Sequence, residues 1–177
     1  AEKAKAAKAS VAAIAGDLVE VESLFAAKAL IASLGSDLTE VRQTGLAYDT
    51  SSLSALHFGS TLPGIEGADV ILLVGSNPRW EAPLVNTRIR KAVKAGAKVL
   101  AIGPEVDLTY KASWLGDDLA LLAKLPKDAA QALKDAKAPA VIVAEAALGQ
   151  AGVFAAALLL AGKGTFNVLH TAAARMG

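Results

Sequence analysis

The sequence contains no cysteine, and this absence removes several kinds of chemistry at once. Disulfides, thiolate metal sites, cysteine nucleophiles and the usual ligands of iron–sulfur clusters all require cysteine. Histidine is scarce too, because only His57 and His170 are present and they lie far apart in the sequence. Neither stands beside a nucleophile motif. We therefore expect no metal site, and we expect both histidines to be structural or exposed.

Long hydrophobic runs and an excess of charge are also missing. Although 54% of the residues are hydrophobic, the longest apolar run, Val153 to Ala161, is far shorter than the roughly 20 residues that a membrane-spanning helix needs. The formal net charge is only +1, and no segment alternates basic residues with exposed aromatics. We expect neither a membrane span nor a nucleic-acid partner.

The length of 177 residues favours one hydrophobic core and one domain. Residues 1–10, AEKAKAAKAS, lack the apolar segment of a secretory signal and are expected to be a linker or a frayed helix. We assign residues 11–177 to the domain.

Four short apolar segments bounded by glycine or proline predict strands that are buried on both faces. They are VAAIAG at 11–16, DVILLVG at 69–75, KVLAIGP at 98–104 and AVIVAEAA at 140–147. Helical patterns separate them. One carries Val21, Leu24, Phe25 and Ile31 on one side, after an Asp17 cap, and the other begins near Pro83 with Val85, Ile89, Ala92 and Val93 on one side.

This alternation of strands and helices predicts an α/β fold, because strands joined by crossover helices pair in parallel. We expect a doubly wound, mainly parallel, Rossmann-like sheet with helices on both faces. Residues 40–67 look like a long excursion at its rim. The final segment, FNVLHTAAARMG, reads as a short strand or turn that enters a helix with no strand after it. We therefore expect a sheet that is incomplete at the C-terminus and a fragment of a longer polypeptide or a split subunit.

The turn Gly75-Ser76-Asn77-Pro78 is the first candidate site. It follows a predicted strand and precedes a helix, which is the usual place for a phosphate in α/β proteins. The alternative is a plain tight turn, since no G-x-G-x-x-G motif is present. LAGKGT at 160–165 is not a phosphate-binding loop, because Gly164 separates the lysine from the threonine, and a helix end is expected there.

Other charged and aromatic residues have two interpretations each. Glu145 lies in an apolar run, which indicates either a place at a strand end or an acid with a perturbed pKa in a cleft. The basic helix side with Arg88, Arg90, Lys91 and Lys94 is interpreted as solvated surface. Arg79 and Trp80 are residue types typical of interface anchors, although Trp80 could equally pack beside the sheet.

Residues 68–118, with GSNPRWEAPLVNTRIRK at 75–91 and VDLTY at 106–110, resemble the large iron–sulfur subunit family of respiratory complex I, the NADH-quinone oxidoreductase. That family belongs to the molybdopterin oxidoreductase superfamily. The resemblance continues in AAIAGDLVEVESLFAAKALIASLGS at 12–36 and in FNVLHTAAARMG at 166–177, so it covers nearly the whole chain.

The resemblance implies an inherited cofactor geometry without the cofactor. In molybdopterin enzymes the loop that matches Gly75 to Pro78 helps to hold the pterin dinucleotide, whereas the complex I subunit is similar in fold without that cofactor. The residues of such a vestigial pocket would be Gly75, Ser76, Asn77 and Asp107. Family members carry 2Fe-2S and 4Fe-4S clusters in a cysteine-rich region that this sequence lacks, and the family commonly has a cysteine where Val41 stands here.

The resemblance therefore implies a scaffold with no catalytic residue, in the peripheral arm of complex I, where electrons pass from NADH toward quinone. The implied partners are the rest of the large iron–sulfur subunit and the other subunits of that arm. The implied place is the matrix side of the mitochondrial inner membrane or the cytoplasmic side of the bacterial inner membrane. The alternative is a domain that still binds a pterin or a nucleotide at the Gly75–Pro78 turn.

Overall fold

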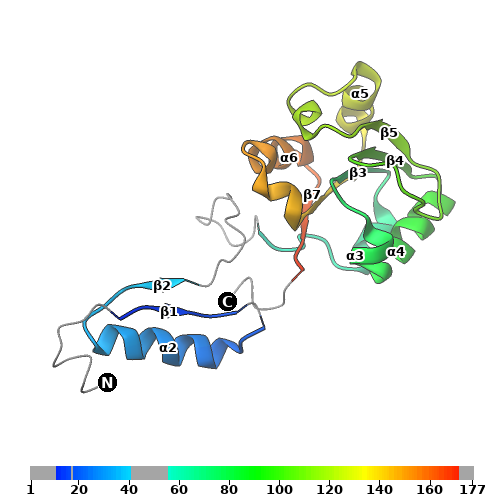
Figure 1. The fold of residues 1–177 in the computed structure, drawn as a ribbon. Coiled ribbons are helices and arrows are strands. Elements are labelled where there is room, and N and C mark those ends of the chain that lie inside the picture. The colour runs from blue at the N-terminus through cyan, green and yellow to red at the C-terminus, as the bar shows by residue number, and fades with distance from the viewer. Residues whose placement is uncertain (1–10, 17, 41–55, 172–177) are drawn as a thin grey trace. The chain divides into compact units, whose positions relative to one another are not determined.

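The computed structural model describes residues 11–16, 18–40 and 56–171. These residues fall into two compact units, one within residues 11–40 and the other within residues 56–171 (Figure 1). The assignment of residues 11–177 to a single domain stays a prediction.

The larger unit contains a five-stranded sheet in which every strand pair is parallel. Its strands, in sheet order, are β5 (Ser113–Gly116), β4 (Lys98–Ile102), β3 (Val70–Val74), β6 (Pro139–Ala144) and β7 (Thr165–Leu169). The chain enters at the central strand β3, runs outward through β4 to β5, and then returns to β6 on the other side of β3. The order of strands therefore reverses between β3 and β6, and this reversal is the switch point where doubly wound sheets bind ligands.

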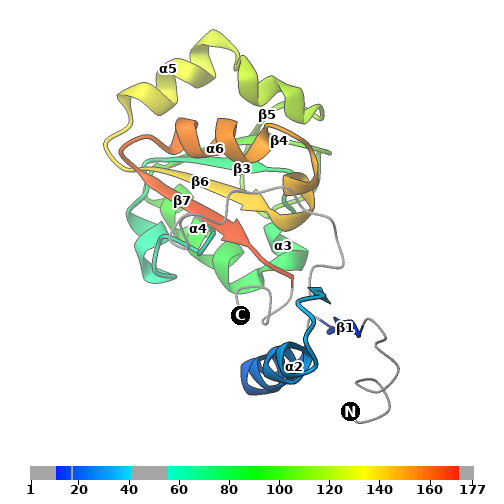
Figure 2. The same cartoon turned by 90° about the vertical axis from the view of Figure 1, so that its left-hand side faces the viewer.

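Helices cover both faces of this sheet, as the sequence predicted. The α-helices are α3 (Pro78–Glu81), α4 (Pro83–Lys94), α5 (Lys127–Asp135) and α6 (Val153–Ala161), and the 3₁₀ helices are η2 (Pro63–Gly67), η3 (Leu119–Ala123) and η4 (Glu145–Gly149). Figure 2 shows α3 and α4 on one side of the sheet and α5 and α6 on the other. The α/β prediction is confirmed.

The core lies where these layers meet. All residues of β3 and β6 are buried, which is why both read as uninterrupted apolar runs. Ile71 and Leu73 of β3 pack in one cluster with Val85 and Ile89 of α4. Because Ile89 is fully buried, its removal from water contributes about 1.5–3 kcal/mol. The apolar stripe predicted for this helix is therefore its sheet-facing side, and Pro83 is its first residue as expected.

The smaller unit contains a two-residue strand β1 (Ala13–Ile14), helix α2 (Val21–Ser33) and a two-residue strand β2 (Thr39–Glu40). The two strands pair in parallel in a sheet of their own. The prediction that VAAIAG forms a strand buried on both faces was wrong, since Ile14 is 79% exposed. Apolar composition favours a strand without deciding which sheet accepts it. The helix was predicted correctly, whereas its cap Asp17 lies outside the described residues.

The sheet of the larger unit has two edge strands that the sequence pattern did not clearly predict. β5 is short, and β7 carries the fully buried polar residue Asn167 within an otherwise apolar run. The Asn167 amide donates to the carbonyl of Val141 and accepts from the backbone N–H of Ser60, at 3.2 and 2.7 Å. This pairing attaches residues 58–60 of the predicted rim excursion to β7. Residues 41–55 of the excursion and residues 172–177 of the predicted final helix lie outside the described residues.

Candidate functional site

The carboxyl ends of the central strands surround a small recess at the switch point. It has a volume of about 240 Å³ and is lined by Gly75, Gly103, Pro104, Asp117, Leu119, Ala146 and Ala147. These residues follow β3, β4, β5 and β6, so the topology alone assembles them. The position is the one that the sequence predicted. Of the predicted pocket residues, however, only Gly75 lines the recess.

Gly75 is required by its backbone and by its neighbour. Its φ angle is +59°, a conformation that L-residues rarely adopt, and its N–H donates to the carbonyl of Ile102 at 2.7 Å. A β-carbon at this position would lie 2.9 Å from the Cβ of Ala147. The segment after β6 therefore packs directly onto the turn after β3, and Ala147 fills the space that a side chain at position 75 would need.

Ser76 and Asn77 are bound to a carboxylate of the same chain. The Ser76 hydroxyl donates to Oε2 of Glu81 at 2.8 Å, and the Asn77 N–H donates to Oε1 of Glu81 at 3.2 Å. Both donors belong to the turn that would bind a phosphate, and Glu81 supplies the negative oxygens instead. The sequence had suggested Glu81 only as a complement to the dipole of the following helix. Its spacing of four residues from Asn77 was the available signal for this closer contact.

Asp107 joins a different contact from the one predicted. Its Oδ2 pairs with the Arg79 guanidinium at 2.5 Å, and its Oδ1 accepts from the N–H of Thr109 at 2.9 Å. The Thr109 N–H and then the Arg79 charge hold the pKa of Asp107 below its ordinary value. Thr109 has a positive φ of 68°, so this Asp107 contact supports a loop conformation that is rare for threonine. Asp107 therefore ties the loop before β5 to α3 and does not line the recess.

The residues present do not fit a phosphate or a pterin dinucleotide. The recess is smaller than the roughly 300–1,000 Å³ of usual ligand sites, and its one charged lining residue is Asp117, whose carboxylate repels an anion. The donors of Ser76 and Asn77 are engaged by Glu81. One feature favours a ligand, because Oδ1 of Asn77 is buried and has no hydrogen-bond partner within the described part of the chain.

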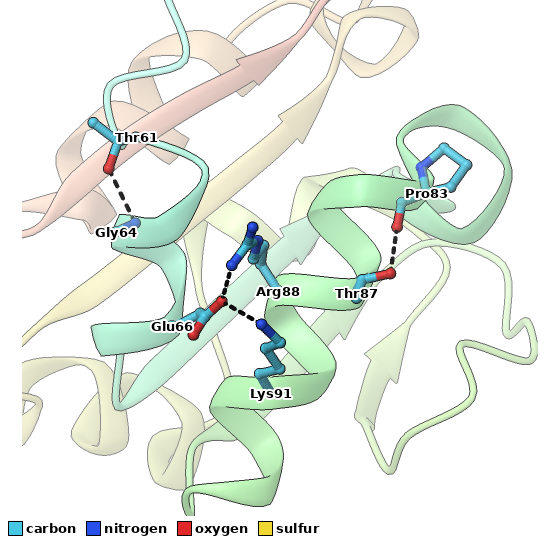
Figure 3. A network of polar contacts seen from close by, with 7 residues as sticks. All are labelled: Thr61, Gly64, Glu66, Pro83, Thr87, Arg88 and Lys91. Carbon is cyan, nitrogen blue, oxygen red and sulfur yellow. Dashed lines mark hydrogen bonds and ion pairs between the residues drawn. The ribbon is translucent and has the colours of Figure 1, made fainter.

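The predicted basic face of α4 is only partly solvated surface. Figure 3 shows Arg88 and Lys91 converging on one oxygen of Glu66, which lies in η2, with Lys91 at 3.1 Å. Both contacts lower the pKa of Glu66. The prediction of solvated surface was therefore wrong for Arg88, which is partly buried because η2 folds against α4 and brings a carboxylate to it, whereas Lys91 is exposed as expected and contacts the same carboxylate. Arg90 and Lys94 are exposed as expected.

The remaining candidates from the sequence are Glu145, the two histidines and the LAGKGT segment. Glu145 begins η4 directly after β6, which confirms the strand-end interpretation, and it accepts from the N–H and the hydroxyl of Thr171 at 2.8 and 2.6 Å. The ring of His170 contacts the Leu56 carbonyl at 2.6 Å, whereas His57 is exposed. LAGKGT contains the end of α6 at Ala161, as predicted.

The sequence left the position of Trp80 open and assigned no position to the side chain of Tyr110. Trp80 does not pack beside the sheet, because it is 80% exposed. The hydroxyl of Tyr110 is buried and has no partner within the described residues, and burial raises its pKa.

Metal ligands do not gather in the part of the chain that the structure describes. That part contains no group of three or more histidine, cysteine, aspartate or glutamate side chains that could hold a metal ion. Among the same residues, no helix has both the length and the apolar character that crossing a membrane requires.

A parallel sheet with this strand order, helices on both faces and a glycine turn at the switch point defines a Rossmann-like α/β protein. The family model for molybdopterin oxidoreductase matches residues 1–177. The chain belongs to the molybdopterin oxidoreductase family.

Similar curated proteins are G subunits of NADH-quinone oxidoreductase. The G subunit of Rickettsia prowazekii (strain Madrid E) is 36% identical over 144 residues, which cover 79% of this chain and 21% of that protein. The G subunit of Rickettsia felis (strain ATCC VR-1525 / URRWXCal2) is 38% identical over 150 residues, which cover 82% of this chain and 22% of that protein. The chain thus spans about a fifth of the length of these relatives.

Proposed function

We propose that this chain is a non-catalytic scaffold portion of the large iron–sulfur subunit of respiratory complex I, and that it supports NADH-to-quinone electron transfer in the peripheral arm. The observation that carries the proposal is that side chains of this chain already contact the Gly75–Pro78 turn. Glu81 takes the donors of Ser76 and Asn77, and Ala147 packs on Gly75. A site with this geometry stabilises the turn and offers little to an anion.

The similarity to NADH-quinone oxidoreductase G subunits supports the complex to which the chain is assigned. The partners would be the rest of the large iron–sulfur subunit and the other subunits of the peripheral arm. The arm would lie on the matrix side of the mitochondrial inner membrane or on the cytoplasmic side of the bacterial inner membrane. Iron–sulfur clusters would be held outside this chain, because the sequence has no cysteine to ligate them.

The alternative is a domain that binds a pterin or a nucleotide at the Gly75–Pro78 turn. The buried Oδ1 of Asn77, which has no partner among the described residues, favours this alternative. Mass spectrometry of small molecules released by denaturing the purified assembly separates the two. The scaffold proposal expects no pterin or nucleotide in amounts comparable with the chain.

Ser76→Ala gives the functional test. In the assembled complex we expect unchanged NADH-to-quinone turnover per complex, because the proposed electron path bypasses this turn. The substitution removes one hydrogen bond to Glu81 and should cost about 0.5–1.5 kcal/mol of stability. Ser33→Ala is the matched control, since it removes one serine hydroxyl bond, to the Leu30 carbonyl, on α2. A large loss of turnover at unchanged subunit content, seen for Ser76→Ala alone, would contradict the scaffold proposal.

A further inference from the structure

The connection from β4 to β5 contains neither helix nor strand. Residues 103–112 form it, whereas a connection between neighbouring parallel strands usually contains a helix. Residues 104–111 of this connection, which we call the strap, take part in no backbone–backbone hydrogen bond within the described part of the chain. The strap can therefore leave its place without breaking any hydrogen bond of the sheet.

The strap is attached by one fully buried side chain and a few polar contacts. Leu108 is 2% exposed and packs in the core cluster with Ile89 of α4. The Leu108 carbonyl accepts from Nδ2 of Asn86 at 3.2 Å. Arg79 of α3 donates to the carbonyl of Asp107 at 3.2 Å and pairs with its carboxylate at 2.5 Å. Side chains of α3 and α4 therefore hold the strap in place.

Other features of the strap oppose this attachment. Thr109 has a φ of 68°, a conformation that is costly for a β-branched residue. The hydroxyl of Tyr110 and Oδ1 of Asn86 are buried and have no hydrogen-bond partner within the described residues. Water would satisfy both atoms if the strap moved away. These gains compete with the burial of Leu108 and with the partial burial of Val106 and Tyr110 against the same cluster.

We propose that the strap opens as a unit while the sheet stays folded, and that the Arg79–Asp107 ion pair is the latch that holds it closed. The inference concerns the larger unit alone and does not depend on the complex to which the chain is assigned. The side chains of the latch are 43% and 75% exposed, so salt weakens it. Pro104, the first residue of the strap, lines the recess at the switch point, so opening changes the shape of that recess.

A single introduced thiol reports opening, because the chain has no cysteine. Leu108→Cys places the thiol in the strap, and Leu73→Cys places it in β3, in the same buried cluster, as the matched control. In the full chain without urea we expect Leu108→Cys to react with a thiol reagent at least about tenfold faster than Leu73→Cys, because local opening exposes it. Its rate should also depend much less on urea, since local opening exposes little surface. Equal urea dependence of the two rates would mean that both thiols react only after global unfolding, and would overturn the proposal.

Asp107→Asn in the Leu108→Cys chain tests the latch. Asparagine keeps an oxygen that can accept from the Thr109 N–H, but it removes the charge that pairs with Arg79. We expect labelling to become about twofold to fivefold faster, the range for an exposed ion pair. Glu105→Gln is the matched control, since it removes an exposed carboxylate of the same strap, and it should leave the rate unchanged. An equal effect of the two substitutions would show that the ion pair is not the latch.

Trypsin tests the strap in chains that keep Leu108. Lys111 lies in the strap, and the exposed Lys94 in the last turn of α4 is the control site. Because proteases cut locally unfolded segments, we expect Asp107→Asn to speed cleavage after Lys111 and not after Lys94. Cleavage after Lys111 that is unchanged by Asp107→Asn would contradict the proposal.

Discussion

At the residue scale, a turn that resembles a phosphate-binding turn has its Ser76 hydroxyl and its Asn77 N–H hydrogen-bonded to Glu81 of the same chain. Three consecutive residues that were predicted together have two different partners, since Gly75 packs against Ala147 while Ser76 and Asn77 both donate to Glu81. A glycine, a serine and an asparagine would suit a phosphate-binding turn as well as they suit the observed turn. Only the identity of the neighbouring side chains separates the two interpretations, because a carboxylate and a phosphate compete for the same donors.

Gly75→Ala should destabilise the larger unit by about 1–3 kcal/mol, because the new Cβ meets Ala147 and alanine disfavours a positive φ. Urea unfolding measures the difference. Gly67→Ala is the matched control, since a Cβ there would meet nothing within 4 Å. An equal effect of the two substitutions would mean that the turn is not closed by Ala147.

At the element scale, polar contacts attach short segments to regular ones. Glu66 joins η2 to α4, Asp107 joins the loop before β5 to α3, and Asn167 joins residues 58–60 to β7. Each contact links residues that are more than 20 positions apart in sequence. For this reason the sequence predicted a solvated basic face on α4, whereas in the fold Arg88 and Lys91 of that face contact Glu66.

The Glu66 contact should make stability depend on pH. Its pKa is lowered in the folded state from the ordinary 4.5 by hydrogen bonds from Arg88 and Lys91. The stabilisation is therefore present above about pH 4.5 and is lost as pH falls through the lower folded-state pKa. Glu66→Gln should lower the melting temperature at pH 7 and should matter less at strongly acidic pH.

The control for this experiment is Glu105→Gln, which alters an exposed carboxylate of the same unit. It should leave the pH dependence close to that of the wild type. High salt should reduce the Glu66→Gln effect at pH 7, because the contact is partly exposed. A Glu66→Gln effect that is independent of both pH and salt would show that the ion pair is not its cause.

At the scale of the whole molecule, the two units differ in how much apolar surface they bury. The larger unit has strands of four to six residues, and its two central ones are fully buried. In the smaller unit the strands have two residues each, and Ile14, Val21 and Phe25 are more than half exposed. Within the described residues 11–16 and 18–40, two short parallel strands and one helix supply little of the burial that independent stability requires.

Amide hydrogen exchange of the purified chain should reveal this difference. The amides of β3 and β6 should exchange slowest, because their hydrogen bonds lie in the centre of a covered sheet. The amides of α2 should exchange much faster, and the chain should bind dyes that report exposed apolar surface. Equal protection of α2 and β3, together with a monomeric sedimentation profile, would contradict the expected difference between the two units.

The sequence by itself determined those elements whose pattern of buried and exposed residues is regular along their whole length. The predictable elements were β3, β4, β6 and α4. A strand that is covered on both faces has a continuous run of apolar residues, and a helix that packs on a sheet has apolar residues along one side. The alternation of these elements also predicted that the strands pair in parallel, and it placed the glycine turn at the carboxyl edge of the sheet.

Tertiary structure alone decided which partners meet. It left β1 outside the main sheet, brought Glu66 to Arg88, and packed Ala147 against Gly75. It also directed Trp80 to solvent. These outcomes depend on side chains that come from distant parts of the chain, and local periodicity carries no information about them. A turn that could hold a phosphate and a turn that holds its own glutamate therefore look alike until the chain is folded.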